Sequence, residues 1–132
     1  MIFVDADAFI GVSISTDPHY RKSTNLFNRL LNSNEALITS WDVVDETATK
    51  LAKFSSKQTA SKFLYFIKKS NIEIKFIDIG LYKRVLNFFM KQTSKNVSVT
   101  DCANMVIAKN LGVTTFFSFD RHYKKNGFKL LE

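Results

Sequence analysis

Short apolar runs alternate with longer amphipathic segments along the whole chain. The runs are three to six residues long and rich in Ile, Val, Phe and Thr, which is typical of buried strands. They predict five strands, at 2–4, 36–39, 72–77, 114–119 and 128–131, the last of them short.

The segments between these runs carry apolar residues at helical spacing. Asp17-Pro18 predicts a helix start, with Asp as the cap and Pro in the first turn. Ser40 and Ser98 are further N-cap candidates. Gly112 is a helix stop. The predicted helices cover 17–31, 41–51, 59–69, 81–92 and 99–111.

Strands that are separated by helices rather than by tight turns need crossover connections, and these produce parallel pairing. We therefore expect a three-layer α/β/α sandwich with a central, mostly parallel sheet of four to five strands. One domain over residues 1–132 fits the length, because a second core would be cramped. Ligands of such folds bind beyond the carboxyl ends of the strands.

Composition narrows the class of protein. Hydrophobic residues make up 45% of the chain, enough for a packed core. The lone cysteine, Cys102, excludes an internal disulfide framework or a thiolate zinc cluster. With no long apolar run and no leader pattern, we expect a cytoplasmic protein that does not enter membranes. The net charge of +7 indicates a polyanionic partner such as nucleic acid.

Acidic residues are the minority charge, and four of them fall at informative positions. Asp5 and Asp120 follow the first and fourth predicted strands, whereas Glu46 and Asp101 lie on helices that can pack beside the same edge. Two like charges about 4 Å apart cost about 4 kcal/mol at an effective dielectric constant of about 20. A cluster of this kind persists if a divalent cation neutralises it or if some acids are protonated. Oxygen ligands alone suit Mg²⁺ or Mn²⁺.

Each acid also has a purely structural explanation. Asp101 stands three residues after Ser98, which is the spacing of a capping box. Glu46 can pair with Lys50 one helical turn later. Asp5 and Asp120 can be turn residues at strand ends. The two explanations stay open for each acid taken alone.

Taken in order, the four acids and their surroundings resemble the PIN-domain nucleases, over essentially the whole chain. The matching segments are Ile2-Phe3-Val4-Asp5, Val43-Val44-Asp45-Glu46, Thr100-Asp101-Cys102-Ala103 and Ser118-Phe119-Asp120. In size the chain is similar to the VapC toxins of prokaryotic toxin–antitoxin pairs. It departs from the family in having Ala6-Asp7 after the first Asp and Ser118 in place of the usual Thr.

The resemblance implies metal-dependent cleavage of RNA with Asp5, Glu46, Asp101 and Asp120 as the acidic quartet. These residues would hold one or two Mg²⁺ or Mn²⁺ ions, with Glu46 orienting a water or acting as general base. The Ser118 hydroxyl would bond one of these carboxylates without touching the metal itself. Asp7 is either a fifth acid near the metal or a cap for the next helix.

The expected partners are RNA, a cognate antitoxin protein and a second copy of the chain. Lys50, Arg121, Lys124 and Lys125 are candidates for binding RNA phosphates, although a solvated cationic face explains them as well. Two alternatives remain: a housekeeping nuclease that processes RNA, and a non-catalytic RNA- or protein-binding domain on the same fold.

Overall fold

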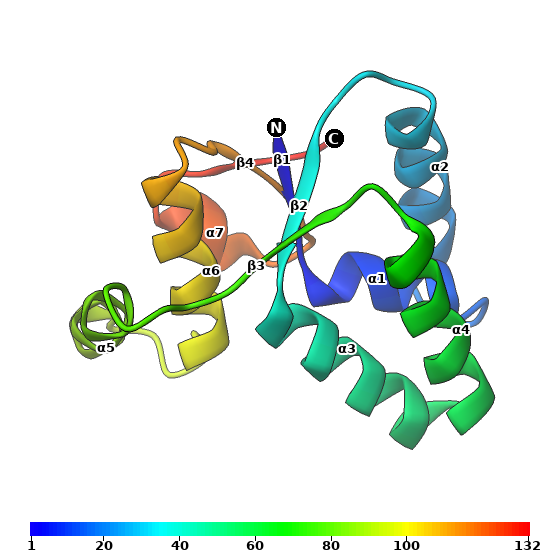
Figure 1. Cartoon of the computed structure of the whole chain (residues 1–132), viewed down its shortest axis with the longest axis horizontal. Coiled ribbons are helices and arrows are strands. Elements are labelled where there is room, and N and C mark those ends of the chain that lie inside the picture. Colours follow the sequence, from blue (N-terminus) through cyan, green and yellow to red (C-terminus); the bar gives the residue numbers. More distant parts are fainter.

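The computed structural model describes residues 1–132 and contains five strands and seven helices (Figure 1). The strands are β1 (Ile2–Val4), β2 (Leu37–Ser40), β3 (Glu73–Lys75), β4 (Thr115–Phe117) and β5 (Lys129–Leu130). The helices are α1 (Ala6–Ser13), α2 (Tyr20–Leu31), α3 (Trp41–Phe54), α4 (Lys57–Lys69), α5 (Tyr82–Lys91), α6 (Val99–Asn110) and α7 (Arg121–Lys125). No helix is both long and apolar enough to cross a membrane.

The sheet has the strand order β3-β2-β1-β4-β5, and every pair is parallel. Strand β1 lies at its centre, with Ile2 opposite Leu37 on one side and Thr115 on the other. The chain leaves β1 toward β2 and later returns to β4 on the opposite flank. This reversal of direction creates the crevice in which open parallel sheets bind ligands, and Asp5 is the first residue beyond β1.

Helices cover both sides of the sheet, as the sequence predicted. Figure 1 shows α5, α6 and α7 on one side of the strands and α1, α2 and α4 on the other. The central strand is buried along its whole length, because a parallel strand between two helical layers has no solvent face. The predicted α/β/α architecture is thus confirmed.

Aromatic packing anchors the site end of the core. The Phe3 and Phe116 rings of the neighbouring strands β1 and β4 stack with centroids 4.8 Å apart. The Phe116 ring also stacks on the fully buried Tyr123 of α7, at 4.1 Å. This packing holds α7, and with it the turn after β4, against the sheet.

Two helices were not predicted. The first, α1, begins directly after β1 and is only eight residues long, and its N-cap residue Asp5 makes no side-chain capping bond. The second, α7, is a single five-residue turn. Both are short: the Asp5 side chain bonds other parts of the site instead of capping α1, whereas the Asp120 side chain caps α7 by accepting the His122 backbone N–H.

Predicted helix boundaries are mostly confirmed. The hydroxyls of Ser40 and Ser98 cap α3 and α6. Helix α6 ends before Gly112, which has the positive φ of 70° that glycine adopts readily. The start of α2 was predicted three residues too early: Asp17 accepts a hydrogen bond from the His19 backbone N–H at 2.8 Å, so the Asp-Pro pair forms a turn before the helix.

Candidate functional site

All four predicted acids line one cavity of about 290 Å³ at the carboxyl edge of the sheet. Asp5 follows β1, Asp120 lies three residues beyond the end of β4, and Glu46 and Asp101 come from α3 and α6. The other residues of the wall are Ala6, Asp7, Ile10, Lys50, Asn96 and Ser98. The adjacent parallel pairing of β1 with β4 is what brings acids from the two ends of the chain together.

Asp5 is the most buried of these acids, with 6% of its surface exposed. Its Oδ2 accepts a hydrogen bond from the Ser118 hydroxyl at 3.0 Å, and its Oδ1 accepts one from the Asn104 amide at 3.4 Å. Burial raises the pKa of Asp5 well above its usual range, and the nearby charges of Asp7 and Asp101 raise it further. The surroundings of Asp5 therefore disfavour its ionised form.

Asp7 belongs to the same cluster, in the first turn of α1. Its Oδ2 accepts hydrogen bonds from the Ser118 hydroxyl at 3.0 Å and from the Phe119 backbone N–H at 2.8 Å. Its Oδ1 is buried and has no hydrogen-bond partner. Burial raises the pKa of Asp7 as well. Of the two roles open to Asp7, the helix cap is wrong, because Asp5 holds the N-cap position.

Ser118 connects these two carboxylates. Its Oγ lies 3.0 Å from an oxygen of Asp5 and 3.0 Å from an oxygen of Asp7, and it accepts the Asp120 backbone N–H at 3.1 Å. A hydroxyl has a single proton and can donate to only one carboxylate at a time. The other carboxylate then faces an oxygen lone pair, so the pair needs a further proton or a cation.

Asp101 has the structural role that its spacing predicted. It completes a capping box with Ser98: the Asp101 Oδ2 accepts the Ser98 backbone N–H at 2.8 Å. Its side chain nevertheless faces the cavity, where the Tyr123 hydroxyl lies 3.5 Å from its Oδ1. The capping box therefore fixes the carboxylate at the site instead of excluding it.

Glu46 and Asp120 are more exposed than the other acids. The Glu46 Oε1 lies 2.6 Å from the Lys50 ammonium, the i,i+4 pair that the sequence predicted. The Asp120 side chain is 54% exposed, and its Oδ1 lies 2.8 Å from the Nδ1 of His122. Both side chains line the cavity, and the exposed Glu46–Lys50 pair can open at little cost, because surface ion pairs of this kind contribute about 1 kcal/mol or less.

Three further residues of the site were not predicted: Asn104, His122 and Tyr123. Asn104, fully buried on α6, accepts a hydrogen bond from the Ser40 hydroxyl at 2.7 Å and donates to Asp5 and to the Tyr123 hydroxyl. The buried His122 places its Nε2 3.5 Å from Asp101 and its Nδ1 beside Asp120. The one signal in the sequence was a polar Asn within the otherwise apolar segment from Cys102 to Ala108.

The side chains that line the acidic cavity have the chemistry of a divalent-cation site. The structure has no three carboxylate or imidazole groups arranged close enough together to hold one metal ion. The chemistry of the donors nevertheless fits Mg²⁺ or Mn²⁺: carboxylate oxygens line the cavity, one buried Asp7 oxygen lacks a partner, and burial together with the neighbouring charges of Asp7 and Asp101 raises the pKa of Asp5. A hard cation is the group that satisfies all three conditions.

The predicted RNA-binding cations are divided between two places. Lys50 lines the acidic cavity. Arg121 and Lys124 line a neighbouring cavity on the far side of the 118–120 turn, and Lys125 lines neither.

An all-parallel sheet with helices on both sides defines an α/β protein, and the acidic cavity lies at the switch point of the sheet, where proteins of this class bind their ligands. The chain belongs to the PIN domain family, whose model matches residues 2–129. Among solved structures it is similar to VapC20 of Mycobacterium tuberculosis, a toxin that cleaves the sarcin–ricin loop. The TM-score is 0.88 and the identity 16%, over 97% of this chain and 96% of that one. A comparison with curated proteins gives no match.

Proposed function

We propose that this protein is a Mg²⁺- or Mn²⁺-dependent endoribonuclease and the toxin of a toxin–antitoxin pair. The observation that carries the proposal is the acidic cavity, where the buried Asp5 and the partly buried Asp7 share a single serine hydroxyl. Such an arrangement costs stability and persists where a cation is needed for function. Membership of the PIN family and the VapC-like fold support the same conclusion.

Asp5, Asp101, Asp120 and Glu46 would hold the metal, which polarises a phosphodiester and lowers the pKa of a bound water. The other residues of the site hold these acids in place. Ser118 orients Asp5 and Asp7 from the end of β4, and the Ser98 capping box with the Tyr123 hydroxyl orients Asp101. Glu46 lines the cavity beside Lys50 and, once released from it, would orient the attacking water or accept its proton.

The metal requirement is the direct test of this proposal. We expect the purified protein to cut RNA in buffer with Mn²⁺, and the cleavage to stop when the metal is removed with a chelator and to return when Mn²⁺ is restored. The measurement is the product pattern of an end-labelled RNA on a denaturing gel. Equal cleavage with and without chelator would rule out the metal-dependent mechanism.

The toxin role is separable from the nuclease activity. We expect expression of the chain to arrest growth and co-expression of a small adjacent open reading frame to relieve the arrest. Cleavage of RNA without growth arrest would instead favour the housekeeping nuclease. Binding of RNA without any binding of divalent ions, measured by calorimetry, would favour the non-catalytic alternative.

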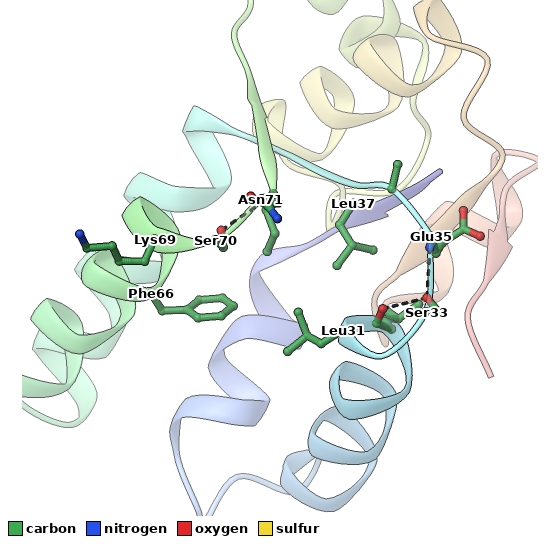
Figure 2. A pocket seen from close by; sticks show the side chains of 11 residues that line it. Leu31, Ser33, Glu35, Leu37, Phe66, Lys69, Ser70 and Asn71 are labelled. Atoms are coloured by element: carbon green, nitrogen blue, oxygen red, sulfur yellow. Dashed lines mark hydrogen bonds between the residues drawn. The ribbon is translucent and has the colours of Figure 1, made fainter.

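A protein inhibitor has a surface available away from the acids. A cavity of about 570 Å³ lies between the ends of α2 and α4 and the start of β2. Figure 2 shows Leu31, Leu37 and Phe66 on its apolar wall. Leu31 and Phe66 also line a second cavity of about 380 Å³ that continues toward α1. The two form one apolar groove at the amino end of β2, so a partner in it would lie away from the carboxyl edge. This groove supports the predicted antitoxin partner.

Self-association remains a prediction, and one apolar surface supports it. Tyr82, Leu86 and Met90 are spaced four residues apart on α5 and are 42%, 48% and 71% exposed. Residues i and i+4 lie on one helix face, so these side chains form a stripe. Val99 of α6 shares a cavity with Tyr82 and Leu86 and extends this stripe.

Charge placed in the α5 stripe should prevent association. We expect Leu86→Lys to convert a dimer into a monomer, because a lysine cannot be buried at the centre of an apolar interface without a partner. Sedimentation or light scattering measures the mass. Asn87→Lys, which adds the same charge at an exposed position beside the stripe, is the control and should leave the mass unchanged. A Leu86→Lys variant with the mass of the wild type would exclude this face as the interface.

A further inference from the structure

A second cavity of about 380 Å³ adjoins the acidic one and has the opposite charge. Its wall is formed by Lys22, Ser118, Phe119, Arg121, Lys124, Leu130, Leu131 and Glu132. Three of these side chains are cationic and one is acidic. Lys124 lies 3.9 Å from Glu132, whereas Lys22 and Arg121 have no carboxylate partner. The cavity therefore presents two uncompensated positive charges.

The two cavities share a wall, which is the turn after β4. Ser118 lines the basic cavity while its hydroxyl bonds Asp5 and Asp7, and Asp120 of the same turn lines the acidic cavity. The Phe119 backbone N–H, bonded to Asp7 at 2.8 Å, fixes the turn in this position. A molecule bound in the basic cavity consequently lies one turn of backbone away from the carboxylates.

The basic cavity also has an aromatic and apolar side. Phe119 is partly exposed there, with the His19 ring stacked on it at a centroid distance of 4.0 Å and an interplanar angle of 3°. The Lys22 ammonium lies 5.9 Å from the centre of the same ring. Leu130 and Leu131 complete the apolar side. Cations for a phosphate beside an aromatic surface for a base are the combination that binds single-stranded nucleic acid.

We propose that this basic cavity is a subsite for one unpaired nucleotide of the RNA, next to the phosphodiester that is cleaved. Lys22 and Arg121 contact the phosphate, and the part of Phe119 that His19 leaves open contacts the base. The proposal rests on the proposed ribonuclease function and adds to it the place of one nucleotide, which must be unpaired there because a base in a duplex cannot turn its face to Phe119. The cavity volume falls in the range of about 300–1,000 Å³ that is usual for small-ligand sites.

Binding can be measured without cleavage. The full chain in chelator is titrated into a fluorescein-labelled, unstructured 12-nucleotide RNA, and affinity is followed by anisotropy at several salt concentrations. We expect Lys22→Gln and Arg121→Gln each to weaken binding at least about threefold and to lower the slope of log affinity against log salt by about 0.7. Phe119→Leu should weaken binding about fivefold or more and leave the slope unchanged.

Matched controls carry the same changes elsewhere. Lys68→Gln removes an exposed cation on α4, and Phe54→Leu removes an aromatic ring that is 71% exposed at the end of α3. Both should bind like the wild type. Lys22 and Arg121 are exposed, so their variants keep the test valid if Phe119→Leu fails to fold.

Two negative results have different meanings. If the wild type binds and cuts RNA but Lys22→Gln and Arg121→Gln match Lys68→Gln, the subsite is wrong and the ribonuclease function stands. If the wild type neither binds the RNA in chelator nor cuts it with Mn²⁺, the ribonuclease function itself is wrong. A duplex of the same sequence that loses as much affinity as the single strand on Phe119→Leu would also overturn the subsite.

Discussion

Replacing Asp5 by Asn should reduce RNA cleavage by at least about 10³-fold, because loss of about 4 kcal/mol of transition-state stabilisation has that effect on a rate. Asp5 is the central carboxylate of the acidic cavity and lies directly beyond the central strand. Asn keeps the shape and removes the charge that the metal requires. Cleavage of labelled RNA with Mn²⁺ measures the effect. Asp45→Asn is the control, because it makes the same change at an exposed position one residue before Glu46.

The same Asp5→Asn variant should be more stable than the wild type in the absence of metal. Burial raises the pKa of Asp5 above its ordinary value of 3.8, so the folded protein resists ionisation of this group more than the unfolded chain does. The penalty is absent below the ordinary pKa, grows as the pH rises from there to the raised pKa, and is complete above it. In the Asp5→Asn variant, the new side-chain amide can donate a hydrogen bond to the Ser118 hydroxyl. The single proton of Ser118 is then free to bond Asp7.

Thermal unfolding separates these effects. At pH 7 without metal we expect Asp5→Asn to gain about 1–2 kcal/mol and about 3–8 °C in Tm, and the gain to vanish near pH 3. Mn²⁺ at about 100 times its Kd should stabilise the wild type by about 2.7 kcal/mol and should leave Asp5→Asn nearly unchanged. A variant that is less stable than the wild type at pH 7, or that responds equally to Mn²⁺, would contradict the assignment of Asp5.

Asn104→Asp should have the second large effect, on stability. The amide of Asn104 donates to Asp5 and to the Tyr123 hydroxyl and accepts from Ser40, all within a fully buried position. Asp at this position removes both donors and adds a buried negative charge beside Asp5. Unsatisfied buried groups cost about 1–3 kcal/mol each, so we expect a loss of about 3–5 kcal/mol at pH 7.

The pH dependence identifies the cause of this loss. The added carboxylate is buried, so the destabilisation should be present above its ordinary pKa and should shrink as the pH falls and the group takes up a proton. Denaturant unfolding at pH 7 and pH 4 measures it. Asn110→Asp, at the exposed end of the same helix, should change stability by less than about 1 kcal/mol. Equal effects at the two positions would show that Asn104 has no special role.

The extent to which the sequence anticipated the fold differs from element to element. All five strands and the caps at Ser40 and Ser98 were predicted, because these signals are local: a short apolar run, or a serine before an amphipathic segment. Helix α1 was missed for the opposite reason. It is only eight residues long and follows β1 directly, and its N-cap side chain, Asp5, bonds Ser118 and Asn104, about a hundred residues away, instead of the helix.

The candidate site shows the same division. Four acids were recognised from their positions after strands and within helices, and the structure brings them to one cavity. The sequence identified Ser118 as a hydroxyl that bonds a carboxylate. The other supporting residues, Asn104, His122 and Tyr123, were not predicted, because they reach the acids only through the packing of α6 and α7 against the sheet. Asp7 was left with two roles, and the structure excluded the helix cap because Asp5 occupies the N-cap position of α1.

By itself, then, the sequence determined an α/β domain with acids at strand ends in a cationic chain, because periodicity, capping and charge are properties of neighbouring residues. The tertiary structure alone decided which groups share a proton, which carboxylates are desolvated and which cations stay unpaired. These properties depend on distances between β1, α6 and the turn after β4, which the parallel pairing of distant strands sets. Burial and the nearby carboxylates raise the pKa of Asp5. The turn after β4 stands between the acidic cavity and the basic cavity beside it.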